Sequence, residues 1–176
     1  LCNYEYILLL DLPSSIQHIG AYGTINDFIS GVPYDGYYRI RVLAESKHRN
    51  HDHIRRISST NPNQPHELAI VPGDILVGAI GMPQHIEPIL ASFTLPDDKQ
   101  EWYEATVWLD AGYTPRFIFP NGTVNARSAN RSTFAEIAPT LDEELVNDFQ
   151  NRRFVTLKYG KLPHIRIHEV EISGPF

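Results

Sequence analysis

The chain has 176 residues, of which 42% are hydrophobic and 20% charged, with a formal net charge of −6 at pH 7. This length suits one domain with a sizeable core, and the composition is that of an ordinary globular protein. The negative charge argues against a nucleic-acid surface, which needs clustered Lys and Arg. Cys2 is the single cysteine, which excludes an intrachain disulfide and a Cys-x-x-Cys-His haem attachment.

Alternating apolar and polar residues predict β-strands in the first half of the chain. Strands are expected at 4–10, 37–45, 67–71 and 75–77, with a Pro-Gly-Asp turn between the last two and a long polar loop over 46–66. The two-residue period of 37–45 is typical of a strand with one buried and one wet face. Its predicted buried side chains are Tyr38, Ile40, Val42 and Ala44.

The same alternation continues in the middle of the chain. It covers 89–95 and 103–109, after which an Asp-Ala-Gly turn leads into 113–119. Because a short turn containing glycine separates two alternating segments, we expect 103–109 and 113–119 to pair as a β-hairpin.

The last predicted strand, 163–172, changes phase in its middle. Its first two isoleucines share one face, but the next two apolar residues fall on the other. A β-bulge at His168-Glu169 would return all of them to the core. The four side chains expected there are Ile165, Ile167, Val170 and Ile172.

The stretch 120–160 does not alternate and is expected to be an insertion. Apolar residues recur at helical spacing in its second half, and Thr140 followed by Glu143 is a capping-box signature. We predict one amphipathic helix over about 140–153. The chain is therefore predicted to be all-β, a single jelly-roll β-sandwich domain over residues 1–176 with one helical insertion.

Three of these segments carry a resemblance to known binding modules. They are the strand from Gly36 to Val42, the turn at 109–112 and the final segment 168–172. They resemble the galactose-binding-like sandwiches of carbohydrate-binding modules, including the calcium-dependent xylan-binding ones. Those modules often place an aspartate calcium ligand in the last strand, where this chain has His168 and Glu169.

Longer motifs at 31–38, 108–117, 158–163 and 167–175 resemble a narrower group. They are similar to a domain of large multidomain bacterial proteins of the planctomycete-type cytochrome c group, which combine a haem domain with domains of unknown function. The resemblance implies a non-haem module, excised from a longer periplasmic or extracellular protein that is itself a candidate oxidoreductase. The implied partners are polysaccharide or neighbouring domains of the same chain, with no nucleic acid and no membrane.

Aromatic residues in and beside the predicted hairpin are the candidate sugar-binding groups. A sugar ring can stack on an aromatic face while polar side chains bond its hydroxyl groups. Trp102 is expected in a charged loop as an exposed stacking group, whereas Trp108 is expected mainly to pack in the core or under the insertion. The full set of ligand-binding candidates is Trp102, Tyr103, Trp108, Tyr113, Asn121, Asn125 and Arg127.

Two groups of potential metal ligands are present, and each has a simpler interpretation. The first could bind zinc, but its spacing matches no zinc motif closely and arginines lie beside it, so a solvated loop is favoured. Its members are His48, His51, Asp52 and His53. The second could bind calcium, the one cofactor left open, although turn chemistry also explains it. Its members are Asp97, Asp98, Glu101 and Asp110.

No catalytic motif accompanies these candidates. The sequence has no Gly-x-Ser-x-Gly nucleophile elbow, and its carboxylates form no local pair of the kind that glycoside hydrolysis uses. We therefore expect a non-catalytic module that binds polysaccharide. The alternative is a structural or docking module that packs against neighbouring domains. An exposed aromatic residue among polar groups would favour the first, and a broad apolar patch the second.

Overall fold

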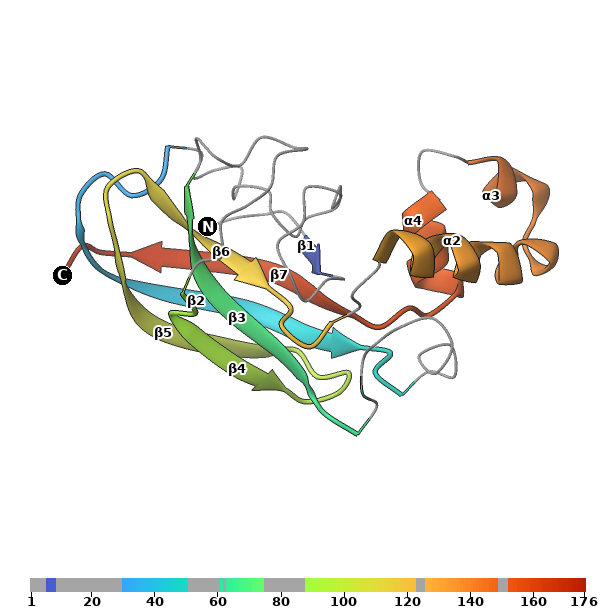
Figure 1. Cartoon of the computed structure of the whole chain (residues 1–176), viewed down its shortest axis with the longest axis horizontal. Coiled ribbons are helices and arrows are strands. Elements are labelled where there is room, and N and C mark those ends of the chain that lie inside the picture. Colours follow the sequence, from blue (N-terminus) through green and yellow to red (C-terminus); the bar gives the residue numbers. More distant parts are fainter. Residues whose placement is uncertain are drawn as a thin grey trace.

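The computed structural model describes residues 6–8, 30–50, 61, 63–74, 88–122, 126–148 and 152–176. The strands in these ranges are β1 (Tyr6–Leu8), β2 (Gly36–Lys47), β3 (His66–Asp74), β4 (Ala91–Leu95), β5 (Glu101–Leu109), β6 (Tyr113–Ile118) and β7 (His164–Ser173). The helices are α2 (Ala126–Ile137), the 3-10 turn η2 (Ala138–Thr140), α3 (Glu143–Asn147) and α4 (Arg152–Tyr159). Figure 1 shows the strands on one side and the helices beyond one end of them.

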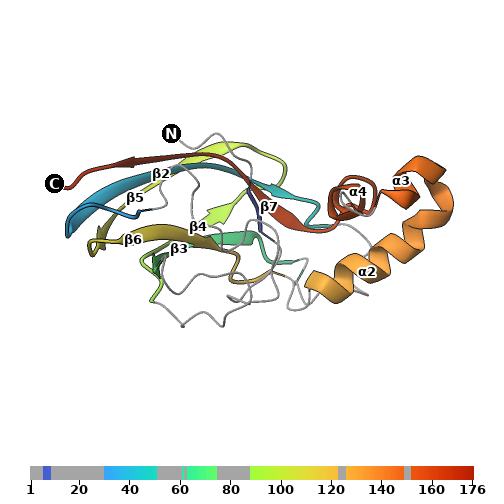
Figure 2. The same cartoon turned by 90° about the horizontal axis from the view of Figure 1, so that it is seen from above.

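The strands form two antiparallel sheets that face each other. One has the order β1-β7-β2-β5 and the other the order β4-β3-β6. Figure 2 shows β7, β2 and β5 as one layer over β6 and β3. Apolar side chains from both layers form one buried cluster, which includes Ile40, Val42, Leu68, Ile70, Leu109, Phe117, Phe119, Ile165 and Ile167. The predicted all-β class is confirmed.

Strand β2 confirms the strongest pattern in the sequence. Tyr38, Ile40, Val42 and Ala44 are all buried, and the residues between them are exposed or half-buried as far as Leu43. Burying one Ile or Val side chain contributes about 1.5–3 kcal/mol, so a strand with four inward residues is strongly held. On the opposite face of β2, Tyr37 and Arg39 are exposed and Arg41 and Leu43 are half-buried, whereas Glu45, expected on the wet face, is buried.

The predicted bulge in β7 is also present. Leu43 lies opposite Glu169, but Ala44 lies opposite Ile167, so His168 is the extra residue. Its ring nitrogen Nε2 lies 3.0 Å from an oxygen of Glu45, which gives the displaced side chain a polar partner. Of the four side chains expected in the core, Ile165, Ile167 and Val170 are buried, and Ile172 packs half-buried against the core.

The predicted hairpin of 103–109 with 113–119 is wrong. Strand β5 pairs with β2, whereas β6 pairs with β3 in the other sheet. The Asp-Ala-Gly turn therefore carries the chain from one sheet to the other, with Gly112 at a φ of 85°. Alternation shows that each segment has one buried face, but it does not say which strand lies beside it.

The predicted break in β3 is wrong as well, because the strand continues through Pro72, Gly73 and Asp74. Pro72 lies beyond Ile70, the last residue that pairs with β4, so it occupies a part of the strand paired on one side only. Prolines are tolerated at such edge positions. The second predicted strand, 75–77, lies outside the described residues.

The insertion is helical, but the single helix predicted over about 140–153 is wrong in its bounds. The described part of the insertion contains α2, α3 and α4. Thr140 is the last residue of η2 and does not begin a helix, and Asp142 is the N-cap residue of α3. The pattern in α2 was missed because small or polar residues occupy buried positions. Its buried residues are Ala129, Thr133, Phe134 and Ile137.

Candidate binding face on the four-stranded sheet

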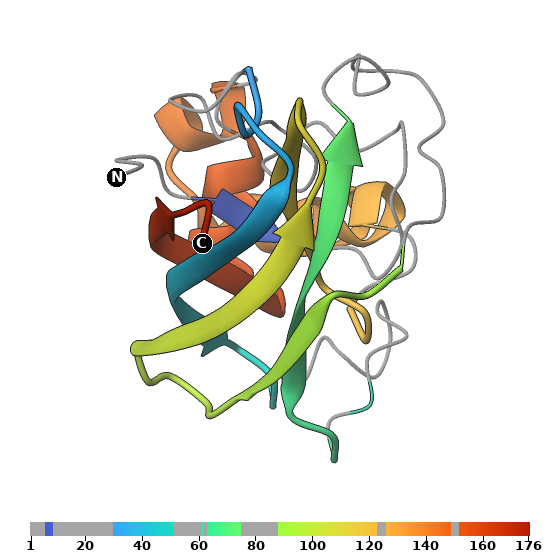
Figure 3. The same cartoon turned by 90° about the vertical axis from the view of Figure 1, so that its left-hand side faces the viewer.

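The outer surface of β5, β2 and β7 carries the exposed tryptophans, and we call it the aromatic face. Figure 3 shows β5 beside β2, with β7 on the other side of β2. The strand register sets the side chains in four cross-strand rows, in which two polar rows lie between two rows with a tryptophan. In order these rows are Trp108–Tyr37, Thr106–Arg39–Ser173, Glu104–Arg41–Glu171 and Trp102–Leu43–Glu169.

Tyr37 and Trp108 form a fixed aromatic pair at one end of this face. They lie opposite each other in the β2–β5 register, and their ring centroids are 5.2 Å apart with an interplanar angle of 82°. The indole Nε1–H of Trp108 donates to Asp110 Oδ1 at 2.9 Å. Tyr37 nevertheless remains 53% exposed and Trp108 48% exposed. Two rings at right angles thus present aromatic surface to solvent in a set orientation.

Trp102 lies at the other end of the face in a different environment. The guanidinium of Arg41 lies 4.5 Å from the centroid of its ring, a cation–π contact. Arg41 Nε lies 3.3 Å from Glu104 Oε2, and the same guanidinium is hydrogen-bonded to Glu171. Trp102 is 39% exposed, so the ring is accessible although the cation lies over it.

The expectations for the two tryptophans need correction. Trp102 lies inside β5 and not in a loop before it. Trp108, expected mainly to be packed, is the more exposed of the two. Tyr37 and Arg41 were not among the candidates, although the alternation of 37–45 already placed both on the wet face. The missing information was the register, which brings β2 beside β5.

The remaining aromatic candidates lie elsewhere. Tyr103 faces the interior, where its ring lies 5.3 Å from that of Phe93. Its hydroxyl donates to Glu101 at 3.5 Å, and burial, with the nearby Glu101 charge, raises the pKa of Tyr103 to about 12. Tyr113 is half-buried at the start of β6. Neither side chain belongs to the aromatic face.

Of the candidates from the insertion, the described side chain of Asn121 does not join the tryptophans. Asn121 is hydrogen-bonded to the chain at the start of β3. Its Nδ2 donates to Pro65 O at 2.8 Å, and its Oδ1 accepts from Glu67 N at 2.9 Å. Asn125 lies outside the described residues. Arg127 belongs to α2, but its side chain is not among those that the structure describes.

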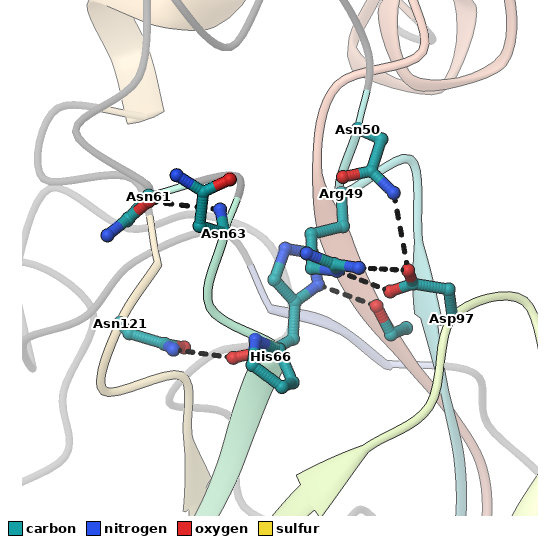
Figure 4. Close-up of polar contacts among 9 residues, drawn as sticks. Arg49, Asn50, Asn61, Asn63, His66, Asp97 and Asn121 are labelled. Atoms are coloured by element: carbon teal, nitrogen blue, oxygen red, sulfur yellow. Dashed lines mark hydrogen bonds and ion pairs between the residues drawn. The ribbon is translucent and has the colours of Figure 1, made fainter.

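Apart from the aromatic face, a cluster of polar side chains lies at the end of the sandwich nearest the helices (Figure 4). Ser46 Oγ lies 2.9 Å from Nδ1 of the buried His66, and Arg49 forms a two-pronged ion pair with Asp97. Burial lowers the pKa of His66 to about 4, and Arg49 lowers the pKa of Asp97. Ser46 is fully buried, which keeps its hydroxyl from acting as a nucleophile towards a bound molecule. The cluster therefore joins the ends of β2, β3 and β4.

The described members of the two groups of possible metal ligands have other partners. Asp97 pairs with Arg49, Asp98 lies 3.5 Å from Lys47, and Glu101 pairs with Lys99. His48 packs against His164 with ring centroids 5.5 Å apart, whereas the other members of its group, His51, Asp52 and His53, lie outside the described residues. Within the described ranges, no three histidine, cysteine, aspartate or glutamate side chains gather in a position to hold a metal ion.

Comparison of the chain with known proteins does not identify a family. Neither a family model nor a curated protein matches the chain. The resemblance to galactose-binding-like modules and to the planctomycete-type cytochrome c group therefore stays a prediction. Among the described helices, none has the length and apolar character needed to cross a membrane.

Proposed function

We propose that this domain is a non-catalytic carbohydrate-binding module whose site is centred on Tyr37 and Trp108. The observation that carries the proposal is an exposed aromatic pair held in one orientation by its mutual contact and by Asp110. Sugar rings have an apolar C–H surface that stacks on aromatic rings. Rings that are already oriented lose little conformational entropy on binding.

The surroundings of the pair suit hydroxyl-rich ligands. Thr106 and Arg39 are exposed in the adjacent row and offer a hydroxyl group and N–H donors. The carboxylate of Asp110 and the phenol of Tyr37 lie at the same end. A few convergent polar groups beside an aromatic surface are the usual composition of a site that fixes a ligand's orientation.

The carboxylates of the face support binding rather than hydrolysis. Glycoside hydrolysis needs one carboxyl group that gives a proton and a second that attacks or activates water. Glu104 and Glu171 are instead both paired with the one guanidinium of Arg41, so both carboxylates are engaged with a cation of the protein itself. We infer that they keep Arg41 in place.

The finer fold and the wider context belong to the same proposal. The chain crosses between the sheets at β2–β3, β4–β5, β5–β6 and β6–β7, and β7 lies between β1 and β2. This order supports a jelly-roll sandwich, a fold common among lectin domains. We also propose that the module belongs to an exported bacterial multidomain protein with a haem domain, as the sequence resemblance implies.

A glycan array probed with the protein tests the proposal. We expect binding to a subset of polysaccharides, and we expect Trp108→Ala to reduce the signal at least tenfold with an unchanged melting temperature. The matched control is Tyr159→Ala, which removes a 41% exposed aromatic residue from α4, away from the aromatic face. Equal binding by the Trp108→Ala variant and the parent would refute the site.

One observation favours docking as the second candidate function. Tyr34 and Phe176 are 68% and 73% exposed, and the backbone N–H of Phe176 donates to Tyr37 O at 3.0 Å. The aromatic pair thus has further exposed aromatic residues near it, which together could cover a neighbouring domain. Absence of binding across the array, with a stable complex between this domain and an adjoining one, would favour docking.

A further inference from the structure

We propose, on the basis of the carbohydrate site above, that the aromatic face binds an extended, linear and uncharged polysaccharide that lies along β5. The ligand would contact Trp108 at one end and Trp102 at the other. This assigns Trp102 as a second stacking group and the two polar rows as the surface between them. The proposed function requires only the Tyr37–Trp108 pair, so the two ideas can fail separately.

The geometry of β5 sets the length of the ligand. Trp102 and Trp108 are six residues apart on a strand with an unbroken register, so both side chains leave the same face of the sheet. At about 3.3 Å per residue, their positions are roughly 20 Å apart. One or two sugar rings cannot cover that distance, whereas a chain of several linked rings can.

The two polar rows between the tryptophans suit a chain of hydroxyl groups. Thr106 and Arg39 form one row, and Glu104 and Arg41 the next. These side chains supply both hydrogen-bond donors and acceptors. Arg41 is held by Glu104 on one side and Glu171 on the other, so its position is fixed before a ligand arrives.

The charge of the face argues for an uncharged ligand. The positive groups are Arg39 and Arg41, and the negative ones are Glu104, Glu169 and Glu171, with Asp110 at the Trp108 end. Both signs are present with a small excess of negative charge, so the face repels a polyanion and has no cluster of one sign to bind a strongly charged chain. Stacking and hydrogen bonds must then supply the affinity.

The energy of stacking explains why length should matter. An aromatic contact of this kind contributes about 0.5–1.5 kcal/mol beyond area burial, so a ligand held by one ring binds weakly. A chain that reaches both tryptophans adds the second contact without paying again for its loss of translational freedom. Affinity should therefore rise with chain length until both ends are covered.

Calorimetric titration with oligosaccharides of increasing length tests the inference. The probes are β-1,4-linked gluco-, xylo- and manno-oligosaccharides, from disaccharide to hexasaccharide, titrated into the full chain. We expect at least tenfold tighter binding of the hexasaccharide than of the disaccharide in the series that binds. Trp102→Ala should remove this gain and leave disaccharide affinity unchanged, and Trp102→Phe should restore most of it.

The variants keep the two proposals apart. Equal affinity for disaccharide and hexasaccharide, with loss of both on Trp108→Ala, would overturn the extended ligand and leave the sugar site intact. A gain with length that persists in Trp102→Ala would overturn the role of Trp102. If no series binds, the extended ligand is overturned, and the glycan array decides the sugar site separately. Circular dichroism and the melting temperature of each variant, with Tyr159→Ala as control, show that a loss of binding is not a loss of fold.

Discussion

Trp108 is held from two sides, by the ring of Tyr37 and by the carboxylate of Asp110. A solvent-exposed indole would otherwise sample several rotamers and lose entropy when a ligand orders it. The hydrogen bond to Asp110 restricts the indole to one orientation. We infer that this restriction matters more for ligand binding than for the stability of the fold. Asp110 was expected either as a turn residue or as a calcium ligand. The structure shows a third role, orientation of the neighbouring tryptophan.

Removing this hydrogen bond should weaken binding without unfolding the protein. We expect Asp110→Ala to reduce sugar affinity about fivefold, because a net hydrogen bond is worth roughly 1 kcal/mol. Asp110→Asn keeps an acceptor oxygen and should lose less. Titration calorimetry gives the affinities, and indole fluorescence reports the change at Trp108. An Asp110→Ala variant with full affinity would show that the indole needs no orientation.

His66 illustrates a buried residue whose role is structural. Its imidazole contacts Ser46 and the ring of Phe119, with centroids 4.6 Å apart in the latter case. Asp97 and Arg49 lie close enough to influence its titration. Burial dominates and lowers the pKa of His66 from 6.5 to about 4. The same cause lowers the pKa of the buried His164 to about 3.

These lowered pKa values predict a loss of stability in mild acid. Below pH 6.5 the unfolded chain binds protons at both histidines, while the folded chain keeps His66 neutral until about pH 4 and His164 until about pH 3, so stability falls through that window. The lowered pKa of His66 alone corresponds to roughly 3 kcal/mol. Urea unfolding at several pH values measures the slope. His66→Gln should flatten the slope between pH 6.5 and 4, and an unchanged slope would contradict this account.

At the scale of elements, the alternation of apolar and polar residues predicts the buried face of a strand more reliably than it predicts which strand lies beside it. In β2 and β7 the apolar inward residues could be predicted, and the phase change in β7 located the bulge at His168-Glu169. The burial of the polar residues Ser46 and His164 could not. The partner of β5 could not be predicted, because local sequence does not encode which of two sheets a strand joins. Without the pairing of β5 with β2, the contact of Tyr37 with Trp108 could not be predicted, and neither could the candidate site.

In the helical insertion, the buried face itself could not be predicted from the sequence. In α2 the buried positions include Ala129 and Thr133, which carry no strong hydrophobic signal. A Cβ atom at Gly160, which follows α4, would lie 2.3 Å from Thr133 Cγ2, so the chain there approaches α2 closely. Small residues packed at short distance produce burial without an apolar stripe, and a search for that stripe finds the wrong helix.

The bulged strand offers a direct stability test. Ile167 is fully buried and lies beside Ala44 at the point where the register shifts. Ile167→Ala should lower the free energy of unfolding by about 2–5 kcal/mol, the usual range for a large-to-small change in a core. Denaturant unfolding measures the loss. A loss below 1 kcal/mol would mean that this part of β7 does not pack in the core.

For the whole molecule, the described residues include two clusters that join the strands and an outer face with exposed aromatic side chains. The buried cluster between the sheets and the polar cluster at Ser46 and His66 hold the strands together. The outer face of β5 and β2 has cross-strand contacts of its own, but these do not require aromatic residues that remain about half exposed. Ligand binding is the explanation that we favour, since a flat surface on rigid strands keeps its residues in place.

The two tryptophan indole N–H signals in a proton–nitrogen NMR spectrum give the most direct test of this account. Trp108→Phe and Trp102→Phe assign the signals, and the protein is then titrated with the longest oligosaccharide that binds. We predict that both signals move together and that backbone signals of β5 and β2 shift with them. Unchanged indole signals, with the shifts confined to α2 and α4, would contradict the account.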